Sequence, residues 1–167
     1  MRIPILHLED GRHQFNSRIE PGKYHFEGDE IYPNGIEVRV RLDKFEKNLK
    51  CHIWISSGAH YTCDRCLAEY DKPFKGDFEL LFHIGMRDLV TDEDDVVLLP
   101  PETVDIDLQG YINEFLILNI PMKTLCKENC LGLCPHCGAD LNKEPCTCKE
   151  VQIDPRWAKL QNLLPEK

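Results

Sequence analysis

The chain has 167 residues, 42% of them hydrophobic and 29% charged, so a folded domain with a real core is expected and disorder is not the default interpretation. The formal net charge is −9, but it is uneven: residues 76–120 hold 11 Asp or Glu against one Lys or Arg, whereas residues 1–75 hold 12 of each kind. This distribution excludes a uniformly basic nucleic-acid-binding surface and leaves room for a local basic patch.

The sequence also bears on where the protein is located in the cell. The opening residues, MRIPILHLEDGRHQF, contain no apolar segment of the kind that directs export, and no stretch approaches the ~18 apolar residues of a membrane span. We therefore expect a cytoplasmic protein without membrane association. In that compartment thiols stay reduced, and clustered cysteines bind metal more often than they form disulfides. The odd number of cysteines, nine, also argues against complete pairing.

Alternating side chains predict most of the first half as strands. Residues 3–15 alternate loosely and predict a first strand, and Pro-rich or Gly-rich turns follow at 21–22 and 33–35. Apolar residues then occupy every second position over residues 36–42 and again over 49–55, on either side of a polar bend at 46–48. This pattern predicts an antiparallel hairpin, and residues 74–84 predict a further strand. Short connections favour an antiparallel sheet over a parallel one.

The acidic segment 87–107 contains the run TDEDD and a Pro-Pro pair, which predict a surface loop with at most a short strand at 96–99. A solvated connection is the ordinary interpretation, and contact with a basic partner is the alternative. Residues 107–119 then carry apolar side chains at the i, i+3, i+4 spacing of an amphipathic helix, with Asp107 as its cap and Pro121 beyond its end. A short final helix is predicted from Asp154 to about Pro165.

Six of the nine cysteines lie between Cys126 and Cys148, in a segment too poor in large apolar side chains to fold by burial alone. Cys134 and Cys137 have the two-residue spacing of a zinc knuckle, which supplies half of a tetrahedral site. The preferred second half is Cys146 with Cys148; Cys126 with Cys130, or a mixed set, are the alternatives. Four thiolates suit a structural Zn²⁺, with an iron–sulfur cluster as the competing group.

Cys63 and Cys66 form a second pair with two-residue spacing. Three interpretations remain open at this point. The pair is half of a second metal site completed by the two module cysteines left over from the first, with Cys51 then spare. Alternatively it is a redox pair, although the βαβ setting of thioredoxin-like proteins is absent, or it is two partly buried thiols without a ligand.

These elements predict an α+β fold. An antiparallel β-rich body with one packed amphipathic helix occupies residues 1–122, and a small C-terminal zinc-binding module occupies residues 123–167. The body also carries a short basic strip that is a candidate RNA contact; an ordinary solvated sheet face is the alternative. The strip comprises Arg39, Arg41, Lys44, Lys47, Lys50 and Arg65. No nucleophile elbow, phosphate-binding glycine loop or HExxH motif suggests an enzyme.

Several of these motifs together resemble the bacterial YceD family of large ribosomal RNA subunit accumulation proteins. They are CDRCL at 63–67, the run CLGLCPHCGADLN at 130–142, CTC at 146–148, and IDPRWAKL at 153–160. The resemblance implies a role in large-subunit rRNA accumulation and ribosome assembly. Family members that keep the CxRC pair but lack the C-terminal cysteines imply that the module stabilises the protein and that function lies with Cys63, Arg65, Cys66 and the basic sheet face.

Three functional hypotheses follow. The first is a non-enzymatic assembly factor that contacts large-subunit rRNA, a ribosomal protein or a maturation enzyme, with Zn²⁺ holding the module rigid. The second is a thiol redox or metal-handling protein that uses Cys63 and Cys66. The third is an adaptor whose acidic segment, centred on residues 92–95, binds a basic ribosomal protein.

Overall fold

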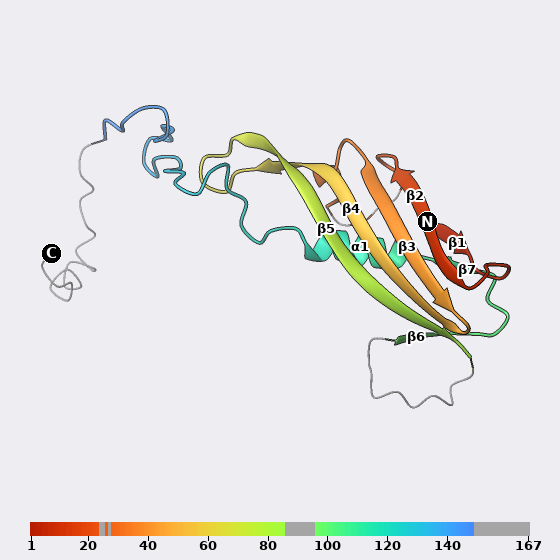
Figure 1. Ribbon diagram of the computed structural model, residues 1–167. Coiled ribbons are helices and arrows are strands. Elements are labelled where there is room, and N and C mark those ends of the chain that lie inside the picture. Colours follow the sequence, from red (N-terminus) through yellow and green to blue (C-terminus); the bar gives the residue numbers. More distant parts are fainter. Residues whose placement is uncertain (24–25, 27, 86–95, 149–167) are drawn as a thin grey trace, which may run out of the picture.

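A computed structural model describes residues 1–23, 26, 28–85 and 96–148. Five strands form the main sheet in the order β2-β3-β4-β5-β6, and the ribbon view shows one helix, α1, lying along it (Figure 1). The strands are β2 (Gly11–Ile19), β3 (Ile36–Phe45), β4 (Asn48–Thr62), β5 (Glu69–Ile84) and β6 (Val96–Leu99). Two three-residue strands, β1 (Arg2–Pro4) and β7 (Asp105–Asp107), pair separately; η1 spans Asp29–Ile31 and α1 spans Gln109–Leu118. The β-rich body with one helix is as predicted.

The alternating pattern of the two central strands decides which face of the sheet is buried. Val40 lies opposite Ile53, and Arg39 lies opposite Trp54, so each cross-strand pair has both side chains on the same face. Val40 and Ile53 are fully buried, whereas Arg39 is exposed. One face of the sheet is therefore apolar and the other polar and charged.

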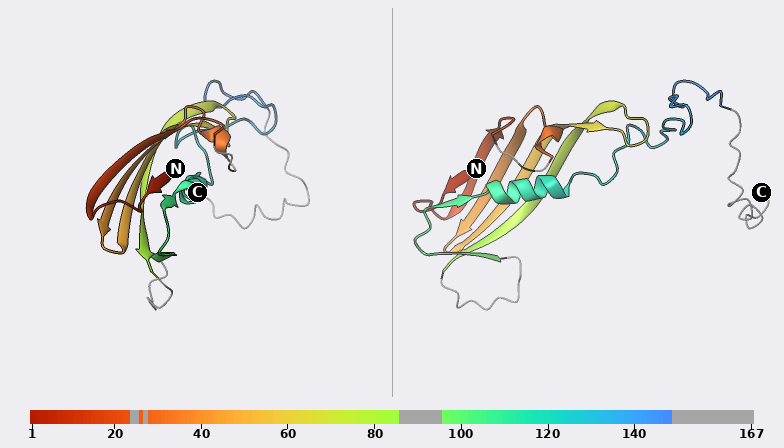
Figure 2. Two further views of the ribbon diagram at one scale, coloured as in Figure 1. Left: turned by 90° about the vertical axis from the view of Figure 1, so that its right-hand side faces the viewer. Right: turned by 180° about the vertical axis from the view of Figure 1, so that it is seen from behind.

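Helix α1 covers the apolar face (Figure 2). Ile112 and Leu116 are fully buried in the core, and the ring of Phe115 stacks on that of Phe78 with centroids 4.6 Å apart. Gly76 makes this close approach feasible, because a Cβ there would lie 2.8 Å from Cζ of Phe115. Burial of the helix against the sheet is the main source of its stability, since a ten-residue helix is marginal by itself.

Strands β4 and β5 are longer than their neighbours and extend past the sheet as a two-stranded ribbon. Strand β3 pairs with β4 only as far as Ser57, whereas β5 pairs with β4 through to Thr62. The turn that closes this ribbon holds Cys63 and Cys66, and the chain that follows α1 passes to the same end of the molecule (Figure 1). The fold thus brings the first cysteine pair and the cysteine module together.

Three sequence-based expectations need correction. Strand β6 pairs with β5 in parallel, so the sheet is mixed. The opening residues form two strands in two sheets, because a turn with a hydrogen bond from Leu8 N–H to the Ile5 carbonyl separates them. Strand β7, inside the segment expected to be a loop, was not predicted. The helix from Asp154 and the TDEDD run lie outside the described residues.

Candidate metal centres

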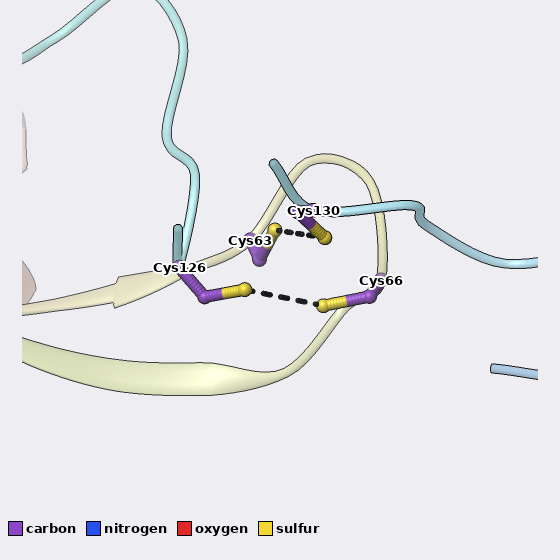
Figure 3. A group of neighbouring side chains, drawn as sticks. All are labelled: Cys63, Cys66, Cys126 and Cys130. Carbon is purple, nitrogen blue, oxygen red and sulfur yellow. Dashed lines mark hydrogen bonds between the residues drawn. The ribbon is translucent and has the colours of Figure 1, made fainter. Parts of the chain in front are cut away.

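Four cysteines gather at the end of the β4–β5 ribbon and form the first cluster. Cys63 and Cys66 come from the turn between the strands, and Cys126 and Cys130 come from the chain that follows α1 (Figure 3). All four sulfur atoms lie within 4.8 Å of one another. The Sγ atoms of Cys63 and Cys130 are 3.9 Å apart, and those of Cys66 and Cys126 are 3.7 Å apart. Four sulfurs at ~2.3 Å from a tetrahedral Zn²⁺ would be separated by about 3.8 Å, so the set matches a zinc site.

Hydrogen bonds hold the returning chain against this turn. The Thr124 amide donates to the Asp64 carboxylate at 2.6 Å, and the Asp64 amide donates to the Thr124 carbonyl at 2.8 Å. The Thr124 hydroxyl donates to the Thr62 carbonyl at 2.6 Å. These bonds extend the pairing of the ribbon and place Cys126 two residues further along, beside Cys66.

Arg65 joins the two halves of the first cluster. Its guanidinium donates to the Cys130 carbonyl at 2.7 Å, and its own carbonyl accepts from the Leu133 amide at 2.9 Å. Gly132 lies directly against it, because a Cβ at that position would be 2.9 Å from the Arg65 carbonyl oxygen. Arg65 therefore positions the second half-site, and its guanidinium is already engaged within the protein.

The second cluster comprises Cys134, Cys137, Cys146 and Cys148, again with all sulfurs within 4.8 Å of one another. Sγ of Cys146 is 3.2 Å from that of Cys134 and 3.5 Å from that of Cys137. Gly138 supports the knuckle with a positive φ of 74°, and its amide donates to the Cys134 carbonyl at 2.9 Å. This cluster is the more open one, since Cys137 and Cys148 are exposed whereas Cys63, Cys66 and Cys130 are buried.

Metal binding fits both clusters better than disulfide formation does. The sulfur atoms within each set are too far apart for a bond of ~2.05 Å, and all nine cysteines are free thiols. Eight cysteines make two sets of four, and the ninth, Cys51, is fully buried in the core of the sheet. Cys134 and Cys137 thus lie with Cys146 and Cys148, the preferred set, and the remaining pair, Cys126 and Cys130, lies with Cys63 and Cys66. Zn²⁺ binding itself stays a prediction.

Only three of the six residues of the expected basic strip lie on one face of the sheet. Arg39, Arg41 and Lys50 share the outward face of the sheet, opposite Trp54, His52 and Asp43 respectively. Lys44 faces the other way: its ammonium donates to the Leu8 carbonyl and lies 3.6 Å from the Asp10 carboxylate. Lys47 is in the turn after β3, and Arg65 is at the far end of β4, whose 15 residues span ~50 Å.

Comparison with known proteins identifies the family of this chain. The family described as "Large ribosomal RNA subunit accumulation protein YceD" matches residues 52–164, which include all eight clustered cysteines. The chain belongs to the YceD family. An uncharacterized protein of Mycobacterium tuberculosis is 38% identical over 135 residues, covering 77% of this chain and 62% of that protein. The uncharacterized protein YlbN of Bacillus subtilis is 32% identical over 77% of this chain and 74% of its own length.

A plant relative carries a functional name. The Arabidopsis thaliana protein called large ribosomal RNA subunit accumulation protein YCED homolog 1, chloroplastic, is 27% identical over 79% of this chain and 50% of its own length. This YceD family chain thus spans about half to two thirds of several relatives. No solved structure matches it significantly. None of its described helices is both long and apolar enough to cross a membrane.

Electrostatics within the clusters of this YceD family member favour a cation. Backbone amides, that of Cys126 foremost, lower the pKa of Cys63 to about 6, and those of Cys137 and His136 lower the pKa of Cys134 to about 6. Burial raises the pKa of Cys126 to about 12. In the second cluster the hydrogen bond with Cys146 raises the pKa of Cys148 to about 12. Thiols this close cannot all ionise without a cation, so loading a metal releases protons.

Three residues that support the clusters were not recognised from the sequence as doing so. The side chain of Asn142 accepts from the Leu131 amide at 3.0 Å and donates to Sγ of Cys130 at 3.4 Å, so it links the two clusters. Asp64 and Thr124 make the contacts described above. Asn142 lies between Cys137 and Cys146 in the sequence, and its spacing from the cysteines carries no signal for its contact with Cys130.

Proposed function

We propose that this YceD family chain is a non-enzymatic factor for accumulation of large-subunit rRNA, acting in ribosome assembly, and that each cysteine cluster holds one structural Zn²⁺. Family membership over a region that contains both clusters carries the proposal. The name of the plant relative supplies the process. Four thiolates in a closed set leave no coordination position for a substrate, so the ions stabilise and do not catalyse.

The first cluster has the more important structural task in this proposal. It ties the β4–β5 ribbon to the chain that follows α1, and so fixes the module on the body. The second cluster organises only residues within the module itself. RNA or protein contacts made by the body and by the module would then be held in one fixed geometry.

The metal content is tested on the full chain purified with zinc present. We expect two Zn²⁺ per chain by elemental analysis, and one per chain after Cys66→Ser or Cys137→Ser. Cys51→Ala is the matched control, because it removes a buried thiol outside both clusters and leaves two ions bound. An unchanged zinc content in both cluster variants would refute the assignment.

The cellular role is tested by deleting the gene in its own host. The ratio of large-subunit to small-subunit rRNA should fall, and the wild-type chain should restore it. Cys66→Ser should restore it less well than Cys51→Ala. A normal ratio in the deletion strain would refute the proposed role, whatever the metal content of the protein.

The thiol redox hypothesis has one observation in its favour, the lowered pKa of Cys63. Full burial of Cys63 opposes it, because an attacking thiolate must be reached by its partner. In the zinc-loaded protein we expect Cys63 and Cys66 to react with an alkylating reagent no faster than after unfolding; rapid labelling in the folded protein would favour redox chemistry.

The adaptor hypothesis depends on residues 92–95, which lie outside the described residues.

A further inference from the structure

The outward face of the main sheet is a candidate binding surface. Helix α1 lies on the opposite face, and no described element covers this one (Figure 2). A groove of about 950 Å³ crosses it from β2 to β5. Its outward-facing side chains come from four adjacent strands, and the central one is Trp54, between Arg39 and Asp77 in the cross-strand row.

Trp54 is held in a defined orientation. The imidazole of His52 stacks on its ring with centroids 3.9 Å apart and planes 14° from parallel, and the Arg41 guanidinium lies 5.4 Å from the ring centroid. His52 is itself fixed, since Nε2 lies 2.9 Å from the Asp77 carboxylate and Nδ1 lies 3.3 Å from that of Glu79. Trp54 is half-buried and its ring plane is already fixed, so it would lose little conformational entropy when a ligand stacks on it. We call the ring of Trp54 with the stacked His52 the aromatic platform.

Trp54 is only half-buried and lines the groove, so part of its ring is accessible from the groove. His52 precedes Trp54 by two residues on β4 and occupies one side of the indole. The same-face residue on the other side is Ser56, whose side chain ends in a single hydroxyl and which lines the groove. A flat aromatic group that enters the groove can therefore reach the exposed part of the Trp54 ring beside Ser56.

The charges around the platform are positive although the whole chain is acidic. The groove is lined by four cationic side chains and two carboxylates, whereas the chain carries a net charge of −9. The cations are Arg18, Arg39, Arg41 and Lys75, and the carboxylates are Glu37 and Asp77. Arg39 and Lys75 are exposed and have no ion-pair partner among the described residues. These two cations are available to an anionic ligand on either side of Trp54.

We infer that this face binds single-stranded RNA, with one unpaired base stacked on Trp54 and backbone phosphates contacted by Arg39 and Lys75. The inference rests on the proposed function, which it deepens by naming the form of RNA and the side chains. A base inside a duplex is already stacked on its neighbours and cannot lie on a protein ring, so the ligand is single-stranded. Aromatic stacking combined with a basic groove is the usual way in which proteins bind single strands.

Binding is tested with the zinc-loaded full chain and a fluorescein-labelled single-stranded 12-nucleotide RNA of mixed sequence, by fluorescence anisotropy. Trp54→Leu should weaken binding about tenfold, near the lower end of what removal of a base-stacking aromatic gives. Trp54→Phe keeps a ring and should bind within about threefold of wild type. Circular dichroism and zinc content establish that each variant is folded. Equal binding by a folded Trp54→Leu variant would overturn the inference, as would stronger binding to a 12-base-pair duplex.

The phosphate contacts are tested by salt dependence. Arg39→Gln and Lys75→Gln should each reduce the slope of log affinity against log salt by about 0.7, the value for one contact to a single strand. Lys72→Gln is the control: it removes the same charge from the same strand, three residues along, where β5 has left the groove for the ribbon. If Lys72→Gln changes the salt-dependence slope as much as Lys75→Gln does, the attraction is nonspecific and the assignment of phosphate contacts to Arg39 and Lys75 is refuted.

The cellular assay separates this inference from the proposed function. If the deletion strain shows a normal rRNA ratio, the proposed function fails. If the deletion lowers that ratio and Trp54→Leu restores it as well as wild type does, the function stands and RNA recognition by this face is wrong. The inference is supported when Trp54→Leu loses both RNA binding and complementation while Trp54→Phe retains them.

Discussion

Gly132→Ala tests whether the two halves of the first cluster meet as closely as the structure shows. Gly132 has a φ of 78°, a conformation that costs an L-residue roughly 1–2 kcal/mol. The added Cβ would also lie 2.9 Å from the Arg65 carbonyl oxygen, a backbone atom that cannot rotate away. Relief requires the Leu133 amide to retreat from the same oxygen, which weakens a hydrogen bond with a net value of about 1 kcal/mol. The expected loss of stability is therefore about 2–3 kcal/mol.

Gly138→Ala supplies a matched control from the other cluster. Gly138 has a nearly equal φ of 74°, but a Cβ there meets nothing within 4 Å. It should therefore lose only the conformational cost of roughly 1–2 kcal/mol. Urea unfolding of the zinc-loaded variants measures both losses. Chelator competition should release zinc from Gly132→Ala at about fivefold lower chelator concentration than from Gly138→Ala, because the weakened hydrogen bond contributes an extra ~1 kcal/mol. Equal losses in the two variants would show that the close approach of Gly132 to Arg65 is not real.

Further predictions concern the clusters, the core and the helix start. Cys126→Ser should destabilise the zinc-loaded protein more than Cys148→Ser, because only the former removes a ligand that ties the module to the body; thermal unfolding with zinc analysis measures this, and the reverse order would contradict it. Phe115→Ala should cost about 3 kcal/mol in urea unfolding, the lower end of the range for a core phenylalanine, because its ring is only partly buried. Leu118→Ala, at a position 75% exposed, should cost less than about 0.5 kcal/mol. Asp107→Ala should cost about 1 kcal/mol at pH 7. The Asp107 carboxylate accepts from the Gln109 amide, and this bond lowers its pKa. Its ionised form therefore stabilises above the unfolded pKa of ~3.9 and loses that effect as pH falls through the folded value, so the difference from wild type should shrink in acid; a constant difference would argue against it.

The strands that alternate over many residues were predictable, and so was the antiparallel β3–β4 hairpin, because a short polar bend joins its strands, whereas the pairing of the shorter strands was not. Periodicity reports which face is buried, so it located the core of β3, β4 and β5. It does not report direction, and the parallel pairing of the four-residue β6 escaped it. Strands β1 and β7 are too short for any period to be seen. Alternation should also have excluded Lys44 from the basic strip, because Lys44 shares the parity of Leu42 and not that of Arg41.

The cysteine clusters were also predictable only where their contacts are local in sequence. Two-residue spacing identified Cys63 with Cys66, and Cys134 with Cys137, as half-sites, because the knuckle is a local structure. The partner of the first half-site depends on α1 carrying the chain back along the sheet to the end of the ribbon, which no local pattern records. Family membership, in contrast, followed from the motifs themselves and is confirmed by the match over residues 52–164.

The long sequence separation within the first cluster also has a consequence for synthesis of the chain. Cys66 leaves the ribosome 60 residues before Cys126 does. At roughly 5–20 residues per second, a gap of 60 residues lasts about 3–12 s, during which the ribbon turn has two thiols and no partners. Cys126 and Cys130 arrive only after α1 has emerged to cover the sheet. In the proposed zinc site, closure of this cluster would therefore be a late event, and an ion bound there would mark a chain whose body has already been synthesised.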